Sequence, residues 1–577
     1  MQIIITFARC LSIGLCCIQL TAVAQNYPSN YFRSPLDIPL KLSGTFGELR
    51  TNHFHSGLDI RTNSVEGLPV FAAAEGHVSR IKVSAYGYGN AVYIDHPNGF
   101  TTVYAHLRDF DEPIASWVEK KHYDKKSFEL DIALFPNELP VSKGQRIAFS
   151  GNTGGSGGPH LHFEVRDTKT EAVINPRHFG FKVADVVAPV IDMVEVVPYN
   201  QTAQINRTRL PRKIPLQRHS GNAYSTQAIT EVYGPVYLQI KTWDKHTANE
   251  FRNGVYQLVL RQNNDTLYHF KADRFEFNET RYANAVMDYE ARMLNKEQLY
   301  RCLKTSGNLL SMLPRHLPNG LIQIPAGETR TYDLVVTDFD GNTASAKFQM
   351  KGAAEAVATL QESQIASMTE RVLPNQAWHW HNDEVQLQMP ANNLYDTLHF
   401  VYKRSVKPYA MFSSVHSIHD ARTPVHAFFE LAIRQTGLVD SLRSKTVMVN
   451  ININKGRTAV TGKWDGAWYR AKVRGLGDFY LAIDTIPPTI KNINVRLEGN
   501  YSPKSQLRFV IGDNLAGLQS YDLYIGDSWQ KTVYDGKTAT LSYTFSENSP
   551  KGNLPLRLVV KDAVGNISTF QTQINSL

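Results

Sequence analysis

Residues 150–164 read SGNTGGSGGPHLHFE, a glycine-rich run that ends in two histidines separated by one leucine. Alternate side chains of a β-strand share a face, so His160 and His162 are expected to point the same way while Leu161 points into the core. A lone histidine is more often a surface or capping group than a ligand. The pattern therefore indicates chemistry only if other parts of the chain bring partners to it.

The stretch from Tyr27 to Arg166 has the texture of an antiparallel β domain with little helix. Short β-branched and aromatic runs are broken by glycine, and PNG (97–99) between two of them indicates a hairpin turn. The runs that predict strands are HVSRIKV (77–83), AVYIDH (91–96), TTVYAHL (101–107), RIAFSG (146–151) and HLHFEVR (160–166). Residues 109–140 form a charged insertion, which predicts a solvated loop or short helix, or the rim of a groove.

Beyond Val187 an internal repeat appears. LVVTDFDGNTASAKF (334–348) matches LVVKDAVGNISTFQT (558–572), and QIKTWDKHTANEF (239–251) resembles RFVIGDNLAGLQS (508–520). Short strands around Asp-rich turns are typical of a β-sandwich. Residues 353–485 open with a helical or linker stretch and continue as alternating strands, which predicts a further sandwich. We identify no chemical cluster in the repeats and expect them to be structural or positioning modules.

The composition of the chain limits where the protein can act and which partners it can bind. The 577 residues are 42% hydrophobic and 20% charged, which argues against wholesale disorder. Residues 1–24 are apolar and end in Ala22-Val23-Ala24, which predicts a secretion signal; an uncleaved membrane anchor is the alternative. Three of the four cysteines lie in that segment, so Cys302 has no partner for an intramolecular disulfide in the mature chain and is expected to be buried. The net charge of +8 comes without a dense basic block, so no nucleic-acid module is expected.

Candidate partners of HLHFE lie upstream in two other motifs. HFHSGLDI (53–60) offers His55 and Asp59, and TVYAHL (102–107) offers His106. A catalytic zinc site needs three nitrogen, oxygen or sulfur ligands and one open position. Gly57 would permit the tight path that brings His55 and Asp59 to one ion. His53, His77, His96 and His122 have no such partners and are expected to be structural or solvated.

These motifs make the segment resemble the lysostaphin-type zinc metalloendopeptidases, peptidase family M23. The resemblance runs through LSGTFGELRTNHFHSGLDI (42–60), LPVFAAAEGHV (68–78), YGYGNAVYIDHPNGFTTVYAHL (86–107) and VSKGQRIAFSGNTGGSGGPHLHFEV (141–165), about a quarter of the chain. It implies that His55, Asp59 and His162 bind one zinc ion and that His106 and His160 are catalytic. The insertion at 109–140 departs from the compact members and puts the shape of the substrate groove in doubt.

The expected fold class is mainly β: an antiparallel, lysostaphin-like metallopeptidase head followed by about three immunoglobulin-like β-sandwich domains. The expected division is a signal peptide at 1–24, a zinc metallopeptidase domain at 25–187 with its insertion at 109–140, sandwich domains at 188–352 and 353–485, and a C-terminal immunoglobulin-like domain at 486–577.

The resemblance implies an exported endopeptidase that hydrolyses peptide cross-links of bacterial peptidoglycan, in the periplasm or at the cell surface. A zinc-activated water would be assisted by the two catalytic histidines, whose individual roles stay open. Peptidoglycan is the expected partner, with no nucleic acid, no stable membrane span in the mature chain, and the sandwich domains available for protein partners. Two alternatives are a non-catalytic envelope scaffold or regulator of cell-wall hydrolases, and an adhesin.

Overall fold

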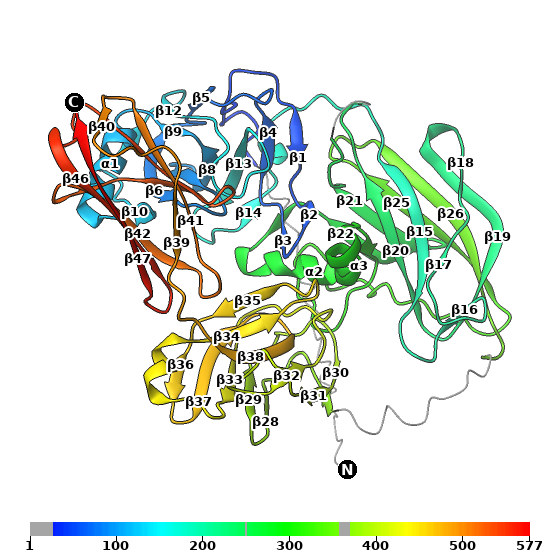
Figure 1. The fold of residues 1–577 in the computed structure, drawn as a ribbon. Helices are drawn as coiled ribbons and strands as arrows, with labels where there is room; N and C mark the ends of the chain where they lie inside the picture. The colour runs from blue at the N-terminus through cyan, green and yellow to red at the C-terminus, as the bar shows by residue number, and fades with distance from the viewer. Residues whose placement is uncertain (1–26, 248–250, 357–369) are drawn as a thin grey trace, which may run out of the picture.

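The computed structural model describes residues 27–247, 251–356 and 370–577. The expected signal segment 1–24 and most of the expected helical or linker stretch at the start of 353–485 lie outside the described residues. The chain is mainly β, as expected, and Figure 1 shows β-rich units following one another from the head to the C-terminal repeat. In the part of the chain that the structure describes, no helix is long and apolar enough to cross a membrane.

The head is organised around one large antiparallel sheet, with the strand order β1-β4-β13-β8-β7-β6-β10. Its strands are β1 (Leu42–Gly44), β4 (Leu58–Arg61), β13 (His160–Asp167), β8 (Phe100–Leu107), β7 (Asn90–Asp95), β6 (Gly76–Val83) and β10 (Leu130–Ala133), with β11 (Pro140–Val141) beside β6 and β14 (Val173–Ile174) beside β13. All five strands predicted in this part of the sequence are present, within one to two residues of the predicted bounds.

Smaller elements complete the head. They are the sheet β5 (Pro69–Phe71), β12 (Arg146–Phe149) and β9 (Asp109–Phe110), the hairpin β2 (Leu49–Arg50) and β3 (His53–Phe54), helix α1 (Ile114–Lys125) and the short η1 (Pro176–Phe179). The charged insertion at 109–140 thus contains a helix and a strand, β10, that extends the main sheet along β6. It is a folded part of the head.

The next unit is a two-sheet sandwich. One sheet has β17 (Arg212–Lys213), β15 (Val190–Pro198), β20 (Val236–Trp243) and β24 (Tyr300–Arg301). The other has β16 (Gln204–Ile205), β19 (Ala223–Tyr233), β26 (Thr343–Gly352), β25 (Thr329–Thr337), β21 (Gln257–Gln262) and β22 (Asp265–Lys271), with β18 (Gln217–Arg218) paired to β19. Between β22 and β25 lie β23 (Arg274–Phe275), η3 (Phe277–Tyr282), α2 (Ala283–Val286) and α3 (Tyr289–Asn295), and the short η2 (Ser220–Asn222) precedes β19. Cys302 is buried here, as expected.

The head and this sandwich share structure. Strand β14 of the head pairs with β23, so the head sheet continues beyond the expected boundary at residue 187. Phe46, Leu49 and Phe54, around the hairpin β2–β3, are buried in the same apolar cluster as the sandwich core. The remainder of the head has its own cluster, which includes Leu161 and Phe163 of β13.

The third unit also has two main sheets. One has β28 (Trp378–His381), β29 (Val385–Met389), β33 (Phe429–Arg434), β37 (Trp468–Val473) and β36 (Lys463–Asp465), and the other has β31 (Tyr402–Ser405), β32 (Val415–Ile418), β38 (Gly477–Ile483), β34 (Thr446–Ile451) and β35 (Arg457–Val460). β27 (Glu370–Val372) pairs with β30 (Leu398–Phe400), and η4 (Asp440–Lys445) precedes β34. The two sheets match the sandwich expected for this region.

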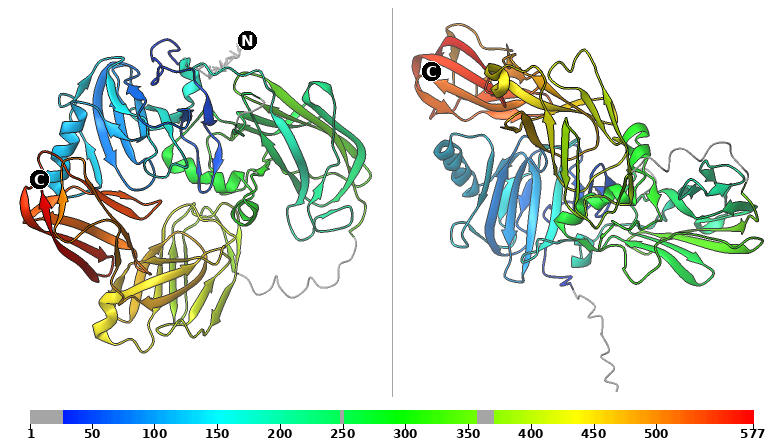
Figure 2. Two further views of the ribbon diagram at one scale, coloured as in Figure 1. Left: turned by 45° about the horizontal axis from the view of Figure 1, so that its top comes forward. Right: turned by 90° about the horizontal axis from the view of Figure 1, so that it is seen from below.

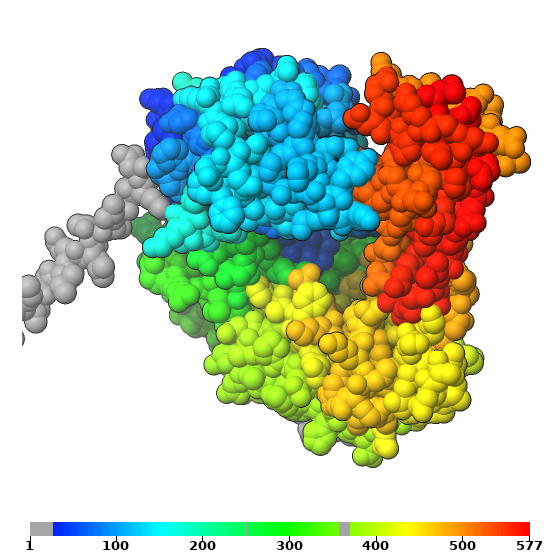
Figure 3. Space-filling view, turned by 90° about the vertical axis from the view of Figure 1, so that its left-hand side faces the viewer, coloured from blue at the N-terminus to red at the C-terminus, as the bar shows by residue number. Residues whose placement is uncertain are grey.

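The C-terminal repeat forms a final sandwich that returns to the head. Its sheets are β39 (Thr489–Asn492), β41 (Gln506–Gly512), β45 (Thr540–Thr544) and β44 (Val533–Asp535), and β40 (Gly499–Tyr501), β47 (Ile567–Ser576), β46 (Gly552–Asp562), β42 (Leu518–Ile525) and β43 (Ser528–Gln530). Lys531 pairs with Glu119 of α1, and the Trp529 ring meets that of Tyr123 at 5.6 Å. Figures 2 and 3 show this repeat beside the head, so the four units close into a ring.

Candidate metal centre

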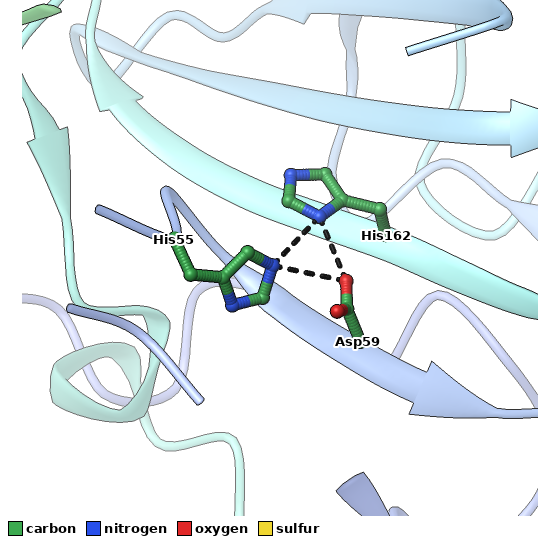
Figure 4. Close-up of side chains that lie close together, drawn as sticks. All are labelled: His55, Asp59 and His162. Carbon is green, nitrogen blue, oxygen red and sulfur yellow. Dashed lines mark hydrogen bonds and ion pairs between the residues drawn. The ribbon is translucent and has the colours of Figure 1, made fainter. Parts of the chain in front are cut away.

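The pairing of two strands brings the first two side chains of the site together. In the antiparallel ladder between β4 and β13, Asp59 lies directly opposite His162. Directly opposed residues of such a ladder present their side chains on the same face. Oδ1 of Asp59 lies 2.9 Å from Nδ1 of His162, as Figure 4 shows. The register between β4 and β13 thus places the side chains of Asp59 and His162 next to each other.

His55 reaches the same point from the loop between β3 and β4. Its Nε2 lies 3.0 Å from Asp59 Oδ1 and 3.0 Å from His162 Nδ1. Its Nδ1 lies 2.8 Å from the carbonyl oxygen of Thr45, which accepts a hydrogen bond and leaves Nε2 to face the pair. Gly57 is required because a Cβ there would lie 2.3 Å from the carbonyl oxygen of Phe163.

The three facing atoms have the chemistry and spacing that zinc requires. Two imidazole nitrogens and one carboxylate oxygen are separated from one another by 2.9–3.0 Å. The corners of such a triangle lie about 1.7 Å from its centre, so a point above its plane can lie about 2.0–2.2 Å from all three, the usual zinc–ligand distance. All three residues are buried. The donor set therefore fits a zinc ion.

His106 and His160 border this triangle. Their ring centroids are 4.8 Å apart, and the His106 centroid lies 5.8 Å from that of His162. Nδ1 of His106 lies 2.8 Å from the carbonyl oxygen of Thr153, and Nδ1 of His160 lies 2.8 Å from that of Gly158. Each carbonyl accepts a hydrogen bond from Nδ1–H, which leaves Nε2 of the neutral ring as a proton acceptor.

His106 reaches the site through an unusual backbone conformation. Regular alternation on β8 would place it on the core side with Tyr104, which is fully buried. Instead His106 has a φ of 60°, in the left-handed region that non-glycine residues rarely adopt. Its ring therefore lies with the other histidines, while Leu107 returns to the core. The strain of such a residue persists only where its surroundings hold it.

Burial lowers the pKa of His55 and His106. It lowers the pKa of His55 to about 4, with the charge of Arg50 acting in the same direction. Burial and the neighbouring His162 and His160 lower the pKa of His106 to about 3. Burial opposes ionisation of Asp59, but the charge of His55 and the close contacts of the His160 and His162 rings with the carboxylate hold the pKa of Asp59 well below its usual range.

Four residues that were not expected to belong to the site support His162. Glu164 is fully buried, and its Oε1 lies 2.8 Å from Nε2 of His162. The same carboxylate accepts hydrogen bonds from Ser56, Tyr88 and Arg166. Glu164 continues the alternation of His160 and His162 on one face of β13, and this period of two was the signal that could have found it.

Arg50 was also not named from the sequence. Its guanidinium lies 2.5 Å from Oδ2 of Asp59, the carboxylate oxygen that does not face the histidines. The ion pair orients the carboxylate so that Oδ1 faces His55 and His162. Arg50 belongs to the hairpin β2–β3, and no local periodicity relates it to Asp59.

Comparison with protein families agrees with this architecture. The sequence model of peptidase family M23 matches residues 53–122 and 131–176, and the gap between the two segments falls inside the insertion. The sequence model described as a Zu5-like domain matches residues 369–484, the third unit of the chain.

Curated relatives match about a quarter of the chain. DD-carboxypeptidase/endopeptidase Mpg of Neisseria meningitidis serogroup B is 36% identical over 131 residues, 22% of this chain and 24% of that protein. Peptidoglycan DD-endopeptidase ShyA of Vibrio cholerae is 32% identical over 139 residues, 23% of this chain and 26% of that protein. The chain thus spans about a quarter of the length of these relatives.

Among solved structures, the catalytic domain of lysostaphin from Staphylococcus simulans is 23% identical, with a TM-score of 0.19. The match covers 25% of this chain and 93% of that domain.

Proposed function

We propose that this chain, which carries a domain of peptidase family M23, is an exported zinc-dependent endopeptidase that hydrolyses peptide cross-links of bacterial peptidoglycan. The observation that carries the proposal is the meeting of three donor atoms within 3.0 Å of one another, from His55, Asp59 and His162, beside two further histidines. The relatives named as DD-endopeptidases support the substrate class. Action on the cell wall would place the protein in the periplasm or at the cell surface.

In this proposal His55 Nε2, Asp59 Oδ1 and His162 Nδ1 hold the metal. Zinc bound there lowers the pKa of a water molecule and polarises the scissile carbonyl. Arg50 and Glu164 keep Asp59 and His162 in their orientations through the contacts described above. Such supporting partners commonly change metal affinity 10- to 100-fold when removed.

His106 and His160 handle the protons of the reaction. Both rings donate Nδ1–H to a backbone carbonyl and present Nε2, so either ring can take a proton from the attacking water and pass it to the leaving amine. The ring that does not act as base can stabilise the developing oxyanion. Both rings hold Nδ1 against a backbone carbonyl, whereas Nε2 of His160 also lies 3.3 Å from Oδ1 of Asp59. The division of roles between the two rings stays open.

The test is to incubate the zinc-loaded full chain with purified peptidoglycan and to identify the released fragments by mass spectrometry. We expect cross-linked dimers to be converted to monomers, and the fragment masses to identify the cleaved bond. His106→Ala is expected to retain about one zinc per chain and to lose turnover by about 10²–10⁴-fold, the usual contribution of a general acid–base group.

His77→Ala, the same substitution on a half-buried strand of the head away from the site, is the matched control and is expected to retain activity. Turnover of His106→Ala equal to that of the parent chain would contradict the catalytic assignment. A chain that binds no zinc and releases no fragment would favour the scaffold alternative.

A further inference from the structure

A second group of metal-ligating side chains lies at the junction between the head and the first sandwich. Asp185 belongs to the segment that leaves the head, and Asp244 and His246 follow β20 of the sandwich. One ligand atom of each lies within 4.8 Å of the others. Two oxygen ligands at 2.3–2.6 Å from a common Ca²⁺ ion are at most about 5 Å apart, so this spacing suits one ion.

The group encloses a small cavity. The cavity has a volume of about 20 Å³ and is lined by Asp185, Asp244, His246 and Asp338, among others. About 10–15 Å³ of such volume is enough for one water molecule, and an ion needs similar space. A third carboxylate, that of Asp338, therefore faces the same enclosed space.

Buried negative charge in this cavity is incompletely compensated. Asp244 is 2% exposed and Asp338 is 3% exposed, and Oδ1 of Asp244 is buried without a hydrogen-bond partner among the described residues. The guanidinium of Arg177 is paired with Asp340, 2.8 Å away. Burial, with the neighbouring Asp185 and Asp338, raises the pKa of Asp244 to about 8. A buried carboxylate of this kind is normally paired or bound to a metal.

The internal repeat reproduces the arrangement. In the C-terminal repeat Asp484, Asp513 and Asp562 also lie within 4.8 Å of one another. They correspond in sequence to Asp185, Asp244 and Asp338, and the expectation that the repeats contain no chemical cluster is therefore wrong. The cluster was missed because its members are distant in sequence and meet only when the sandwich closes.

Hydrogen bonds confirm the correspondence. Asp185 accepts from the Val187 amide, as Asp484 does from that of Ile486. Asp338 accepts from the side chain of Asn342, as Asp562 does from that of Asn566.

The two clusters also share an unpaired carboxylate oxygen. Oδ1 of Asp513 is buried without a hydrogen-bond partner among the described residues, like Oδ1 of Asp244. His246 has no counterpart, since Leu515 holds its position in the alignment of the repeats.

We propose that the carboxylates of Asp185, Asp244 and Asp338 bind a divalent cation of the hard, oxygen-preferring class, with Ca²⁺ the expected ion, at the junction of the head and the first sandwich. The cavity is lined by these three carboxylates and by one imidazole, that of His246. A ligand set dominated by oxygen favours such a cation over zinc. The cation ties the segment that leaves the head to the ends of β20 and β25. Thr45, whose carbonyl orients His55, lines the same cavity, so the junction lies directly behind the candidate zinc centre.

The experiment measures thermal unfolding and calorimetric binding of the zinc-loaded full chain, with CaCl₂ as the probe. We expect Ca²⁺ to raise the melting temperature of the parent chain. Asp244→Asn replaces a buried carboxyl, whose ionisation burial and the neighbouring carboxylates oppose, by a neutral amide of the same shape. The variant is expected to melt higher than the parent in calcium-free buffer and to lose the calcium response. A merely structural role of Asp244 would lower the melting temperature under both conditions.

Two variants sharpen the test. Asp265→Asn makes the same change at an exposed position of the same sandwich and is expected to keep the full calcium response. His246→Leu copies the C-terminal repeat and is expected to keep calcium binding. The proposal is overturned if Asp244→Asn binds Ca²⁺ as tightly as the parent chain does. It is also overturned if millimolar Ca²⁺ neither binds to the parent chain nor raises its melting temperature, or if ZnCl₂ in excess of the catalytic ion raises that temperature and CaCl₂ does not.

Discussion

His162 has different partners on its two ring nitrogens, and this decides its charge. Nδ1 faces Asp59 and His55, while Nε2 donates to Glu164. Burial opposes a charged ring, but hydrogen bonds and charges of Asp59 and Glu164 outweigh burial and raise the pKa of His162 to about 9. In the metal-free chain at neutral pH, Nδ1 therefore carries a proton that a metal must displace.

The apparent affinity for zinc is accordingly expected to rise about tenfold per pH unit from pH 6 to pH 9 and then to level off, with about one proton released per ion. His55, whose pKa is lowered to about 4, adds no proton competition in this range. Competition titrations against a chromophoric chelator at a series of pH values would measure the slope. Affinity that is constant between pH 7 and pH 9 would contradict the assigned protonation of His162.

Glu164→Gln is the control for this pH dependence. Loss of the carboxylate charge lowers the pKa of His162, so the slope between pH 7 and pH 9 is expected to flatten. Above pH 9, where no proton competes, the variant is expected to bind zinc about 10- to 100-fold more weakly than the parent, because the glutamine orients and polarises the ring less well. Circular dichroism would check that the variant is folded.

At the scale of elements, the hairpin β2–β3 holds the first zinc-ligand loop against the sandwich. Phe54, 1% exposed, precedes His55 and packs 5.6 Å from the ring of Phe275 and 6.2 Å from that of Phe270. The amide of Phe54 donates to Thr280 Oγ1 at 3.1 Å. The position of His55 thus depends on residues more than 200 positions away in the sequence.

Phe54→Ala is expected to destabilise the unit formed by the head and first sandwich by about 3–5 kcal/mol, the usual cost of emptying a buried phenylalanine site. It is also expected to weaken zinc binding, because His55 follows directly. Phe135→Ala, at a side chain 75% exposed in the insertion, is the matched control and should change stability by less than about 0.5 kcal/mol. Unfolding curves in urea and a zinc titration would measure both effects. Equal zinc affinity of Phe54→Ala and the parent would contradict the proposed support.

At the scale of the molecule, the head is covered on two sides. The sandwich supplies the apolar partners of Phe46, Leu49 and Phe54, and the C-terminal repeat meets α1 through Lys531 and Glu119. A cavity of about 840 Å³ lies between the head and this repeat, and Thr153, whose carbonyl holds His106, is among its lining residues. The first sandwich and the C-terminal repeat therefore form part of the surroundings of the site.

A fragment of residues 27–187 is expected to bind zinc weakly and to aggregate, because it exposes the apolar side chains of the hairpin β2–β3. A fragment of residues 27–352 retains their cover and is expected to bind zinc as the full chain does. Metal titration and analytical ultracentrifugation of the two fragments would test this. A monomeric 27–187 fragment with the zinc affinity of the full chain would show that the head is independent of the sandwich.

Local sequence patterns predicted the strands of the head and named five residues that the fold brings close together. Both signals are local: alternation with a period of two defines β13 and β8, and short motifs carry His55 with Asp59 and His160 with His162. The repeats were likewise visible as similar segments. Local pattern was sufficient wherever a residue's neighbours in space are also its neighbours in sequence.

Other features of the site arise from packing between segments that are far apart in the sequence. His106 leaves the strand alternation through a backbone conformation that the surrounding structure holds. The ion pair of Arg50 with Asp59 likewise depends on how the hairpin β2–β3 packs against β4. Asp185, Asp244 and Asp338 line one cavity at the junction of the head and the first sandwich, although they are far apart in the sequence. Such arrangements depend on strand register and on packing between distant segments, which leave no periodicity in the sequence.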